Sequence, residues 1–307
     1  MTRPSRYLKE ARRARADEFH TPSSMIGREL PLHADRFRGR HVVMPCNDGQ
    51  DSAFARFLSA HYAEYGLAGL TGFTYEPTYG TLWPEGAGLR HDWRDGVWET
   101  RRLASDGGFE SMDVLSLLHR PGTLVVSNPP FSRMRRFLQL LDQTRVDFLI
   151  VIPLTAVAAP AALPHLLDGS WRLGASIQSG GVRFHVPDDY PLTGYDTGRD
   201  KDGAFIQVSG VRWLTSLPDT PRPLLDLTAN RYEPGRFRVY DRLDAIDIPR
   251  LKDMPADYPG VMGVPITVFD HVHHMRPRVE LLGLRHDLTV DGRGVFCRVL
   301  ARIDPTP

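Results

Sequence analysis

The order of apolar and polar residues predicts alternating strands and helices in the first half of the chain. Short apolar runs bounded by turn-forming residues indicate strands, and apolar residues at helical spacing indicate helices between them. The predicted strands are 41–45, 70–75, 123–127 and 148–153, and a β-hairpin is predicted at 90–102 around Asp95-Gly96. The predicted helices are 21–32, opened by Thr21-Pro22, and 51–65, 110–119 and 133–142. This alternation predicts an α/β fold with a mostly parallel, doubly wound sheet, whose ligands bind beyond the carboxyl ends of the strands.

From about Ser170 the pattern changes to short β-like runs separated by Gly, Pro and Asp. The runs are 172–178, 182–186, 204–208, 211–214, 237–240, 264–269, 279–282 and 295–303. Part of this region must complete the sheet. The Asp- and Gly-rich stretch 188–203 and the segment 218–262 are interpreted as loops or as an inserted recognition element.

Length and composition predict a globular protein, because 307 residues with 41% hydrophobic content can bury a sizeable core. No apolar run approaches the roughly 20 residues that cross a bilayer, and the basic first residues lack the apolar segment of a signal peptide. We therefore expect no membrane partner and a cytoplasmic location. Cys46 and Cys297 form no CxxC pair, so neither a disulfide framework nor a thiolate metal site is indicated.

The charge balance gives no overall attraction to polyanions, since the formal net charge is +1. Only Lys9, Lys201 and Lys252 among the 38 basic residues are lysines, so 35 are arginines. Arginine pairs well with phosphates and guanine edges. A GC-rich genome would produce the same bias and is the simpler explanation, so nucleic-acid binding must be argued from local clusters.

The segment Asn128-Pro129-Pro130-Phe131 directly follows the apolar strand 123–127 and is the strongest candidate for a catalytic site. An amino group on an sp² carbon is a poor nucleophile, and acceptors aimed at its N–H bonds favour the tetrahedral nitrogen that attacks a methyl donor. Asn128 offers a side-chain carbonyl and Pro129 a main-chain carbonyl in a loop stiffened by consecutive prolines. Phe131 offers a ring on which an extruded base can stack. The alternative is an ordinary Asn-Pro turn.

A cofactor loop is expected after the first strand, at Pro45-Cys46-Asn47-Asp48-Gly49. This loop lacks a glycine-rich pattern. Asp48 is the candidate for binding an ammonium group, although Asp48-Gly49 also fits a plain β-turn. Glu76, at the end of the second strand, is the candidate for accepting hydrogen bonds from ribose hydroxyls.

Five collinear segments together resemble the EcoRI-type adenine-specific DNA methyltransferases. They are DEFHT at 17–21, the segment 42–52 with its Cys-Asn-Asp turn, VVSNPPFS at 125–132, GVRWLTSL at 210–217 and DYPGVMGVPIT at 257–267. The resemblance implies a class I fold with a seven-stranded sheet, S-adenosyl-L-methionine as cofactor, and methyl transfer to adenine N6 in DNA. It also implies that Phe19 and Thr21 lie against the methionine end of the cofactor, alongside Pro45, Asn47 and Asn128.

Two segments depart from the pattern of that family. Where the family tends to have Gly-Asp-Phe, this chain has Gly107-Gly108-Phe109, so a carboxylate expected near the cofactor's adenine ring is missing. Asp106 is the proposed substitute, and Phe109 is expected to pack on the ring. The family's Gly-Asn run after the strand 148–152 is replaced by Pro153-Leu154-Thr155.

Candidate DNA contacts are the arginines that follow the catalytic loop, Arg133, Arg135 and Arg136. A solvated helix face is the competing interpretation. Sequence recognition is expected in the arginine-bearing irregular segment, which contains Arg222, Arg231, Arg236, Arg238 and Arg242. Surface histidines are a better explanation of His271, His273 and His274 than a metal site.

The sequence therefore predicts a site-specific DNA adenine-N6 methyltransferase without a metal. Its expected organisation is a flexible basic arm at 1–16, a cofactor-binding catalytic domain at 17–217, and a DNA-recognition region at 218–307 packed on it. Two alternatives remain open: an amino-group methyltransferase acting on cytosine N4, RNA or a protein amide, and an inactive DNA-binding relative. Any cognate restriction or defence component is encoded elsewhere.

Overall fold

The computed structural model describes residues 21–46, 49–76, 86–178, 180–186, 197–201 and 203–304. The chain divides into two compact units. Of the described residues, the larger unit contains 21–162 and 174–220, and the smaller unit contains 163–173 and 221–304.

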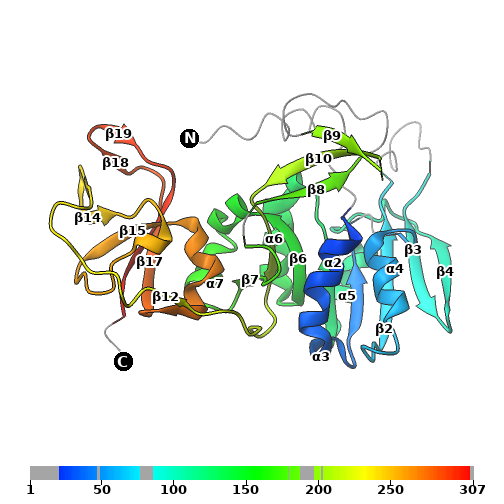
Figure 1. Ribbon diagram of the computed structural model, residues 1–307. Coiled ribbons are helices and arrows are strands. Elements are labelled where there is room, and N and C mark those ends of the chain that lie inside the picture. Colours follow the sequence, from blue (N-terminus) through cyan, green and yellow to red (C-terminus); the bar gives the residue numbers. More distant parts are fainter. Residues whose placement is uncertain are drawn as a thin grey trace. The chain divides into compact units, whose positions relative to one another are not determined.

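An eight-stranded sheet has the strand order β4-β3-β2-β1-β5-β6-β11-β7, and every strand except β7 belongs to the larger unit (Figure 1). Its strands are β1 (His41–Met44), β2 (Gly69–Thr74), β3 (Leu89–Arg94), β4 (Val97–Arg102), β5 (Thr123–Ser127), β6 (Asp147–Pro153), β7 (Arg172–Leu173) and β11 (Val211–Thr215). The neighbours β2, β1, β5 and β6 are parallel, which confirms the predicted mostly parallel core. The expected count of seven strands is not confirmed: the sheet has eight, of which the antiparallel pair β3 and β4 forms one edge.

The helices of the larger unit fall close to their predicted positions. They are α2 (Ser23–Glu29), the 3-10 helix η1 (Leu30–His33), α3 (Ala34–Phe37), α4 (Ala53–Ala60), α5 (Met112–Leu118), the 3-10 helices η2 (Phe131–Arg133) and η3 (Leu154–Ala158), and α6 (Met134–Thr144). One capping prediction was wrong: Pro22 takes the N-cap position of α2, and no side chain caps it. Proline supplies no side-chain acceptor there, so the first N–H groups of α2 lack the predicted threonine cap.

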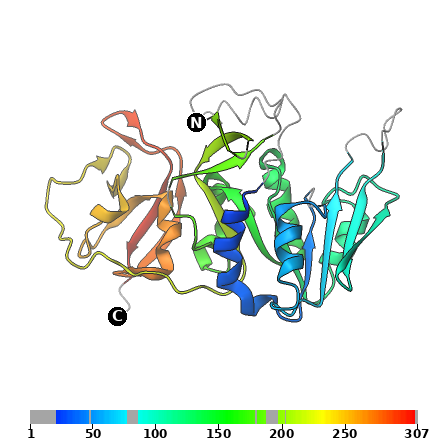
Figure 2. The same cartoon turned by 45° about the vertical axis from the view of Figure 1, so that its right-hand side comes forward.

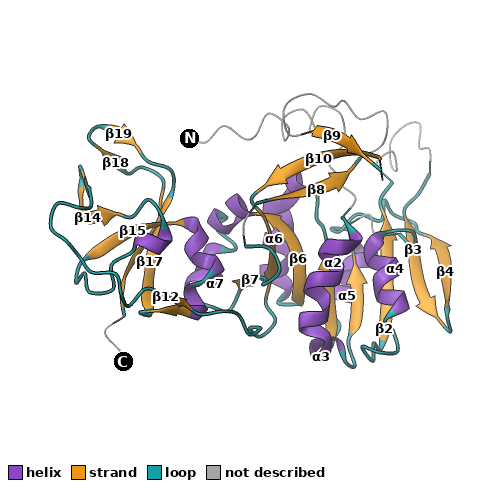
Figure 3. Cartoon of the chain, in the orientation of Figure 1, coloured by secondary structure: helices purple, strands orange, loops and turns teal. Residues whose placement is uncertain are grey.

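The direction in which the chain crosses the sheet places the helices on both of its faces. It moves from β1 through α4 to β2, and in the opposite direction from β5 through α6 to β6. Because crossovers between parallel strands are right-handed, α4 and α6 cover opposite faces (Figure 3). All five residues of β5 are consequently buried, as a strand covered on both faces requires.

A second, three-stranded antiparallel sheet in the larger unit consists of β8 (Gly181–His185), β10 (Gly203–Ser209) and β9 (Thr197–Asp200). It lies in the chain between β7 and β11. The predicted strand 172–178 shrinks to the two residues of β7, because the chain turns away after Leu173. Most of the predicted loop 188–203 lies outside the described residues.

The smaller unit begins with α7 (Leu163–Asp168) and is otherwise rich in short strands. Its five-stranded sheet has the order β13 (Val239–Tyr240), β14 (Leu243–Asp247), β15 (Val261–Pro265), β20 (Arg298–Ile303) and β17 (Val279–Arg285). Two shorter pairs are β12 (Leu225–Asp226) with β16 (Met275–Arg276), and β18 (Thr289–Val290) with β19 (Arg293–Gly294). The 3-10 helices are η4 (Leu251–Asp253), η5 (Ile266–Asp270) and η6 (Val272–His274). The predicted strand 264–269 was therefore wrong beyond Pro265, where η5 begins.

Candidate active site at the carboxyl edge of the sheet

The loops that follow β1, β2, β4, β5 and β6 emerge at one edge of the large sheet. Four of these strands are parallel neighbours. β3 is antiparallel to β2, and β4 is antiparallel to β3, so β4 again runs in the common direction. Loops that are distant in sequence are thus brought to the edge where ligands bind in sheets of this type.

The catalytic loop predicted at Asn128-Pro129-Pro130-Phe131 leaves this edge at the centre of the sheet. Ser127 is fully buried at the end of β5, and Asn128 is half-buried with its side-chain oxygen Oδ1 inside the protein. On the other side of the loop, Arg133 donates its backbone N–H to the Pro130 carbonyl at 3.0 Å, and α6 follows directly. Because α6 buries Met134, Phe137, Leu138 and Leu141, the loop is anchored at both ends.

The loop after β1 connects directly to the N-terminus of α4. Pro45 and Cys46 are buried, whereas Asn47 and Asp48 lie outside the described residues. Ser52 donates its backbone N–H to the Gly49 carbonyl at 2.9 Å, and its hydroxyl caps α4 by accepting from the backbone N–H of Ala55 at 3.0 Å. Of the N-terminal signature residues, Phe19 lies outside the described residues and Thr21 is buried beside α2.

The ends of β2 and β4 bring together two carboxylate-bearing residues that the sequence singled out separately. Glu76 donates its backbone N–H to the Asp106 carbonyl at 2.8 Å. Glycine makes this approach sterically feasible, since a Cβ atom on Gly88 would lie 2.6 Å from the Asp106 carbonyl oxygen. Gly107 adopts a φ of +70°, and a Cβ atom there would lie 2.6 Å from the Thr74 carbonyl oxygen. The backbone contact therefore places Asp106 beside Glu76.

Gly108 has a defined structural role in the segment that departs from the family pattern. Its backbone N–H donates to the Asp106 carboxylate at 2.9 Å. A Cβ atom on Gly108 would lie 3.3 Å from both that carboxylate and the ring of Tyr75. The turn thus accommodates Gly108 tightly and orients Asp106. Tyr75, which sequence reasoning did not single out, packs against this turn.

Phe109 is packed inside the protein rather than on an open surface. Its residue exposure is 3%, its ring meets that of Phe137 edge-on with 5.1 Å between centroids, and the Arg133 guanidinium lies 4.5 Å above it. Cation–π and edge-to-face contacts of this kind hold a ring in place. Phe109 therefore supports the loop, and little of its ring is available to a ligand.

The arginines after the catalytic loop are partly neutralised by Glu110. Arg133 pairs with one carboxylate oxygen of Glu110, and the Arg136 Nε donates to the other at 2.8 Å. Arg135 is exposed, and no described residue forms an ion pair with it. Sequence reasoning missed Glu110, which follows Phe109 and lies more than 20 residues from its partners.

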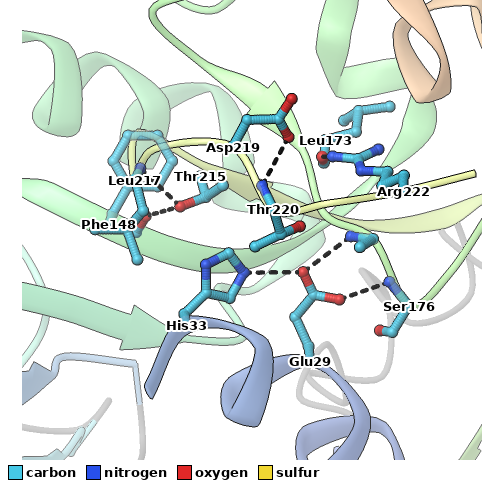
Figure 4. Close-up of polar contacts among 11 residues, drawn as sticks. Glu29, His33, Phe148, Leu173, Ser176, Thr215, Leu217, Asp219, Thr220 and Arg222 are labelled. Atoms are coloured by element: carbon cyan, nitrogen blue, oxygen red, sulfur yellow. Dashed lines mark hydrogen bonds and ion pairs between the residues drawn. The ribbon is translucent and has the colours of Figure 1, made fainter. Parts of the chain in front are cut away.

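Two other predicted clusters lie in the smaller unit. Arg222 lies beside Leu173 and donates to its backbone carbonyl (Figure 4). It also donates to the backbone carbonyl of Asp270 at 3.0 Å, so its role is structural. Arg231, Arg236 and Arg238 are largely exposed, each with an acidic residue within 4.0 Å. His271 lies between η5 and η6, and His273 and His274 lie in η6. Within the described part of the chain no group of three or more His, Cys, Asp or Glu side chains could hold a metal ion.

A buried carboxylate that the sequence did not reveal connects α2 to the segment before β8. Glu29 is fully buried, and its two oxygens accept the backbone N–H groups of Ala175 at 3.0 Å and Ser176 at 2.7 Å (Figure 4). His33 Nε2 lies 3.2 Å from the same carboxylate. Burial alone would raise the pKa of Glu29, but the hydrogen bonds from His33 and Ser176 outweigh it and hold the pKa below its ordinary value.

Comparison with known proteins gives one consistent result. The family model described as "Adenine-specific methyltransferase EcoRI" matches residues 7–294. The chain is 29% identical over 318 residues to the Type II methyltransferase M.EcoRI of Escherichia coli, covering 97% of this chain and 96% of that protein. It is also 29% identical over 268 residues to the Type II methyltransferase M.MpnI of Mycoplasma pneumoniae, covering 85% of this chain and 81% of that protein. No solved structure matches significantly. None of the described helices is long and apolar enough to cross a membrane.

Proposed function

The chain belongs to the EcoRI family of adenine-specific methyltransferases, and from this premise we propose that it transfers a methyl group from S-adenosylmethionine to N6 of an adenine in duplex DNA. The observation that carries the proposal is the Asn128-Pro129-Pro130-Phe131 loop, anchored at the carboxyl end of the central strand β5. The order of the sheet places this loop beside the loops of the neighbouring parallel strands. A loop at this edge that carries hydrogen-bond acceptors suits the transfer of a methyl group to an amino group.

The residues around the loop fit S-adenosylmethionine. Glu76 and Asp106, joined through their backbones, supply two carboxylates that suit ribose hydroxyls and an amino group. The close approach of Gly88 to Asp106 holds these acceptors at one edge. By resemblance, Asp48 binds the methionine ammonium, and Phe19, Thr21, Pro45 and Asn47 complete the site. When bound, S-adenosylmethionine supplies an electrophilic methyl group on its sulfonium sulfur.

We assign Asn128 and Pro129 to activation of the target amino group. The Asn128 side-chain carbonyl and the Pro129 main-chain carbonyl accept hydrogen bonds from the two amino N–H bonds, which directs the nitrogen lone pair toward the methyl carbon. Preorganised acceptors of this kind are usually a large part of catalysis. Direct transfer would need no covalent enzyme intermediate: the N–C bond would form as the sulfonium S–C bond breaks, the thioether S-adenosylhomocysteine would leave, and the amino proton would pass to solvent.

We assign Phe131 to stacking against the extruded base, because enzymes that modify a base inside a duplex first flip it out. Phe131 is 8% exposed, so the base would cover the small part of the ring that remains accessible. Among the arginines after the loop, Arg135 is the best candidate for a phosphate contact, since Glu110 already pairs with Arg133 and Arg136.

The test is methyl transfer from labelled S-adenosylmethionine to separate duplex DNA, RNA and protein substrates, followed by digestion and mass spectrometry of the products. We expect N6-methyladenine in DNA. Label in RNA or protein alone contradicts the proposal, and N4-methylcytosine in DNA contradicts the assigned acceptor. A chain that binds the cofactor but methylates none of these substrates would be an inactive DNA-binding relative.

A further inference from the structure

The sheet β8–β10–β9, called here the ribbon sheet, starts at the same edge as the catalytic loop. β10 ends at Ser209, and Gly210 turns the chain with a φ of +70°. The next residue, Val211, pairs with Pro153 at the carboxyl end of β6. The ribbon sheet is therefore attached to β11, which only β6 separates from β5, the strand that Asn128 follows. Figures 1 and 2 both show it above that edge.

The ribbon sheet has one buried and one exposed face. Phe184 and Ile206 are directly opposite each other on β8 and β10, and both are buried. Arg183 and Gln207 form the next opposite pair, and both are exposed. Since side chains directly opposite each other in antiparallel strands project from the same face, an arginine and a glutamine stand side by side on the exposed face.

The Arg183 guanidinium is stacked on an aromatic ring. Its guanidinium carbon lies 4.7 Å from the centroid of the Phe205 ring. Gly198 is opposite Phe205 on β9, and a Cβ atom there would lie 2.8 Å from the ring, so the glycine leaves room for the ring to lie across the strand. Gly181 likewise leaves room for the Gln207 side chain, because a Cβ atom on Gly181 would lie 2.9 Å from the Gln207 Cγ.

This arrangement orders Arg183 without neutralising it. None of the ion pairs among the described residues involves Arg183, whereas Arg133 and Arg136 both pair with Glu110. A guanidinium stacked on a ring keeps its edge donors directed outward.

We propose that the exposed face of the ribbon sheet enters the major groove of DNA next to the target adenine, with Arg183 and Gln207 reading base edges. The major groove admits an antiparallel β-ribbon. Arginine pairs with guanine through O6 and N7, and glutamine pairs with adenine through N6 and N7. The proposal rests on the proposed function and deepens it, because it assigns recognition to the catalytic unit itself.

The experiment reads the methylated motif directly. The wild type and the variants Arg183→Ala, Arg183→Lys and Gln207→Ala are expressed in a bacterial host that lacks adenine methylation, and N6-methyladenine is mapped by single-molecule sequencing. The matched control is Arg94→Ala, because Arg94 precedes the turn between β3 and β4 at the opposite edge of the large sheet and, among the described residues, forms an ion pair only with exposed Glu99. Thermal unfolding and labelled-cofactor binding of each purified protein are compared first.

We expect Arg183→Ala to lose discrimination at one G·C position and Gln207→Ala at one A·T position, each by a factor of roughly 5 to 150. Arg183→Lys should also lose discrimination at this G·C position, because lysine cannot form the two-point contact with guanine. The control should methylate the wild-type motif. If an alanine variant methylates nothing in cells, purified protein at high concentration is tested on a random duplex library, where a relaxed motif supports the proposal.

Unaltered motifs in both alanine variants would overturn the inference. The same holds if Arg183→Ala lowers methylation of all sequences equally and Arg183→Lys restores the level of methylation, since that behaviour is typical of a phosphate contact. A wild type that leaves no N6-methyladenine contradicts the proposed function instead. In that case, the recognition roles of Arg183 and Gln207 are tested by binding: the wild type and each variant select duplexes from a random pool, and the selected sequences are compared.

Discussion

Glu29→Ala is predicted to destabilise the larger unit strongly. The substitution removes the acceptor of two part-buried backbone N–H groups, those of Ala175 and Ser176, and leaves both donors without that partner. Each such donor costs about 1–3 kcal/mol, and breaking a buried charged network typically costs about 3–5 kcal/mol. At about 2–4 °C per kcal/mol for a unit of this size, the melting temperature should fall by roughly 10 °C.

Glu29→Gln is the graded version of the same perturbation. Glutamine retains one acceptor oxygen, so the free energy of unfolding should fall by about half as much as in Glu29→Ala. The matched control is Glu64→Ala, because the Glu64 side chain is 70% exposed and its removal should change stability by less than about 0.5 kcal/mol. Calorimetry or circular dichroism measures the unfolding temperature. A Glu29→Ala protein that melts with the wild type would refute the assigned role.

The same network predicts an acid dependence. Since the folded-state pKa of Glu29 is lowered, its contribution is fully present above the unfolded pKa of about 4.3 and is lost as the pH falls through the folded value. Denaturant titrations between neutral pH and pH 3 should show that the stability gap between wild type and Glu29→Gln narrows at low pH. A constant gap would contradict the pKa assignment.

Three further predictions concern the candidate active site. Asn128→Ala should leave S-adenosylmethionine binding largely intact while lowering methyl transfer by orders of magnitude; equal activity in a single-turnover assay would end the catalytic assignment. Asp48→Ala should weaken cofactor binding, and calorimetry that finds the same dissociation constant would argue against that role. Gly88→Ala should displace the segment that carries Asp106, because its Cβ would lie 2.6 Å from the Asp106 carbonyl oxygen, and should so weaken cofactor binding. Gly294→Ala is the control, because its added Cβ would meet no atom within 4 Å and its backbone is not left-handed.

Local signals predicted most of the sheet and the catalytic loop. The strand 123–127 appears as predicted, because a run of apolar residues between turn formers is buried wherever the chain places it. The hairpin at 90–102 also formed around Asp95 and Gly96, whose φ values of 50° and 86° are those that a tight turn between twisted strands requires. The Asn128 loop was recognisable because its strand, turn and helix are contiguous in the chain.

Short-range patterns failed where a strand ends early. The apolar run 264–269 predicted one strand, but the chain leaves the sheet after Pro265 and forms η5. Proline lacks the N–H that would continue a ladder, and the buried residues of η5 satisfy the same apolar pattern in a helical turn. A short run of apolar residues therefore does not by itself distinguish a buried strand from a buried helical turn.

The amino-acid sequence by itself predicted most strands and helices of the larger unit, their order and the candidate chemistry of the loop after β5. The tertiary structure decided which charges are neutralised and which face outward. Glu110 pairs with Arg133 and Arg136 across 23 and 26 residues, and Glu29 reaches Ala175 across 146 residues. Hydrophobic periodicity reports only which side of an element is buried, whereas the partner of a charge depends on how distant elements are brought together. For that reason Arg183 on its phenylalanine ring emerged only from the folded chain.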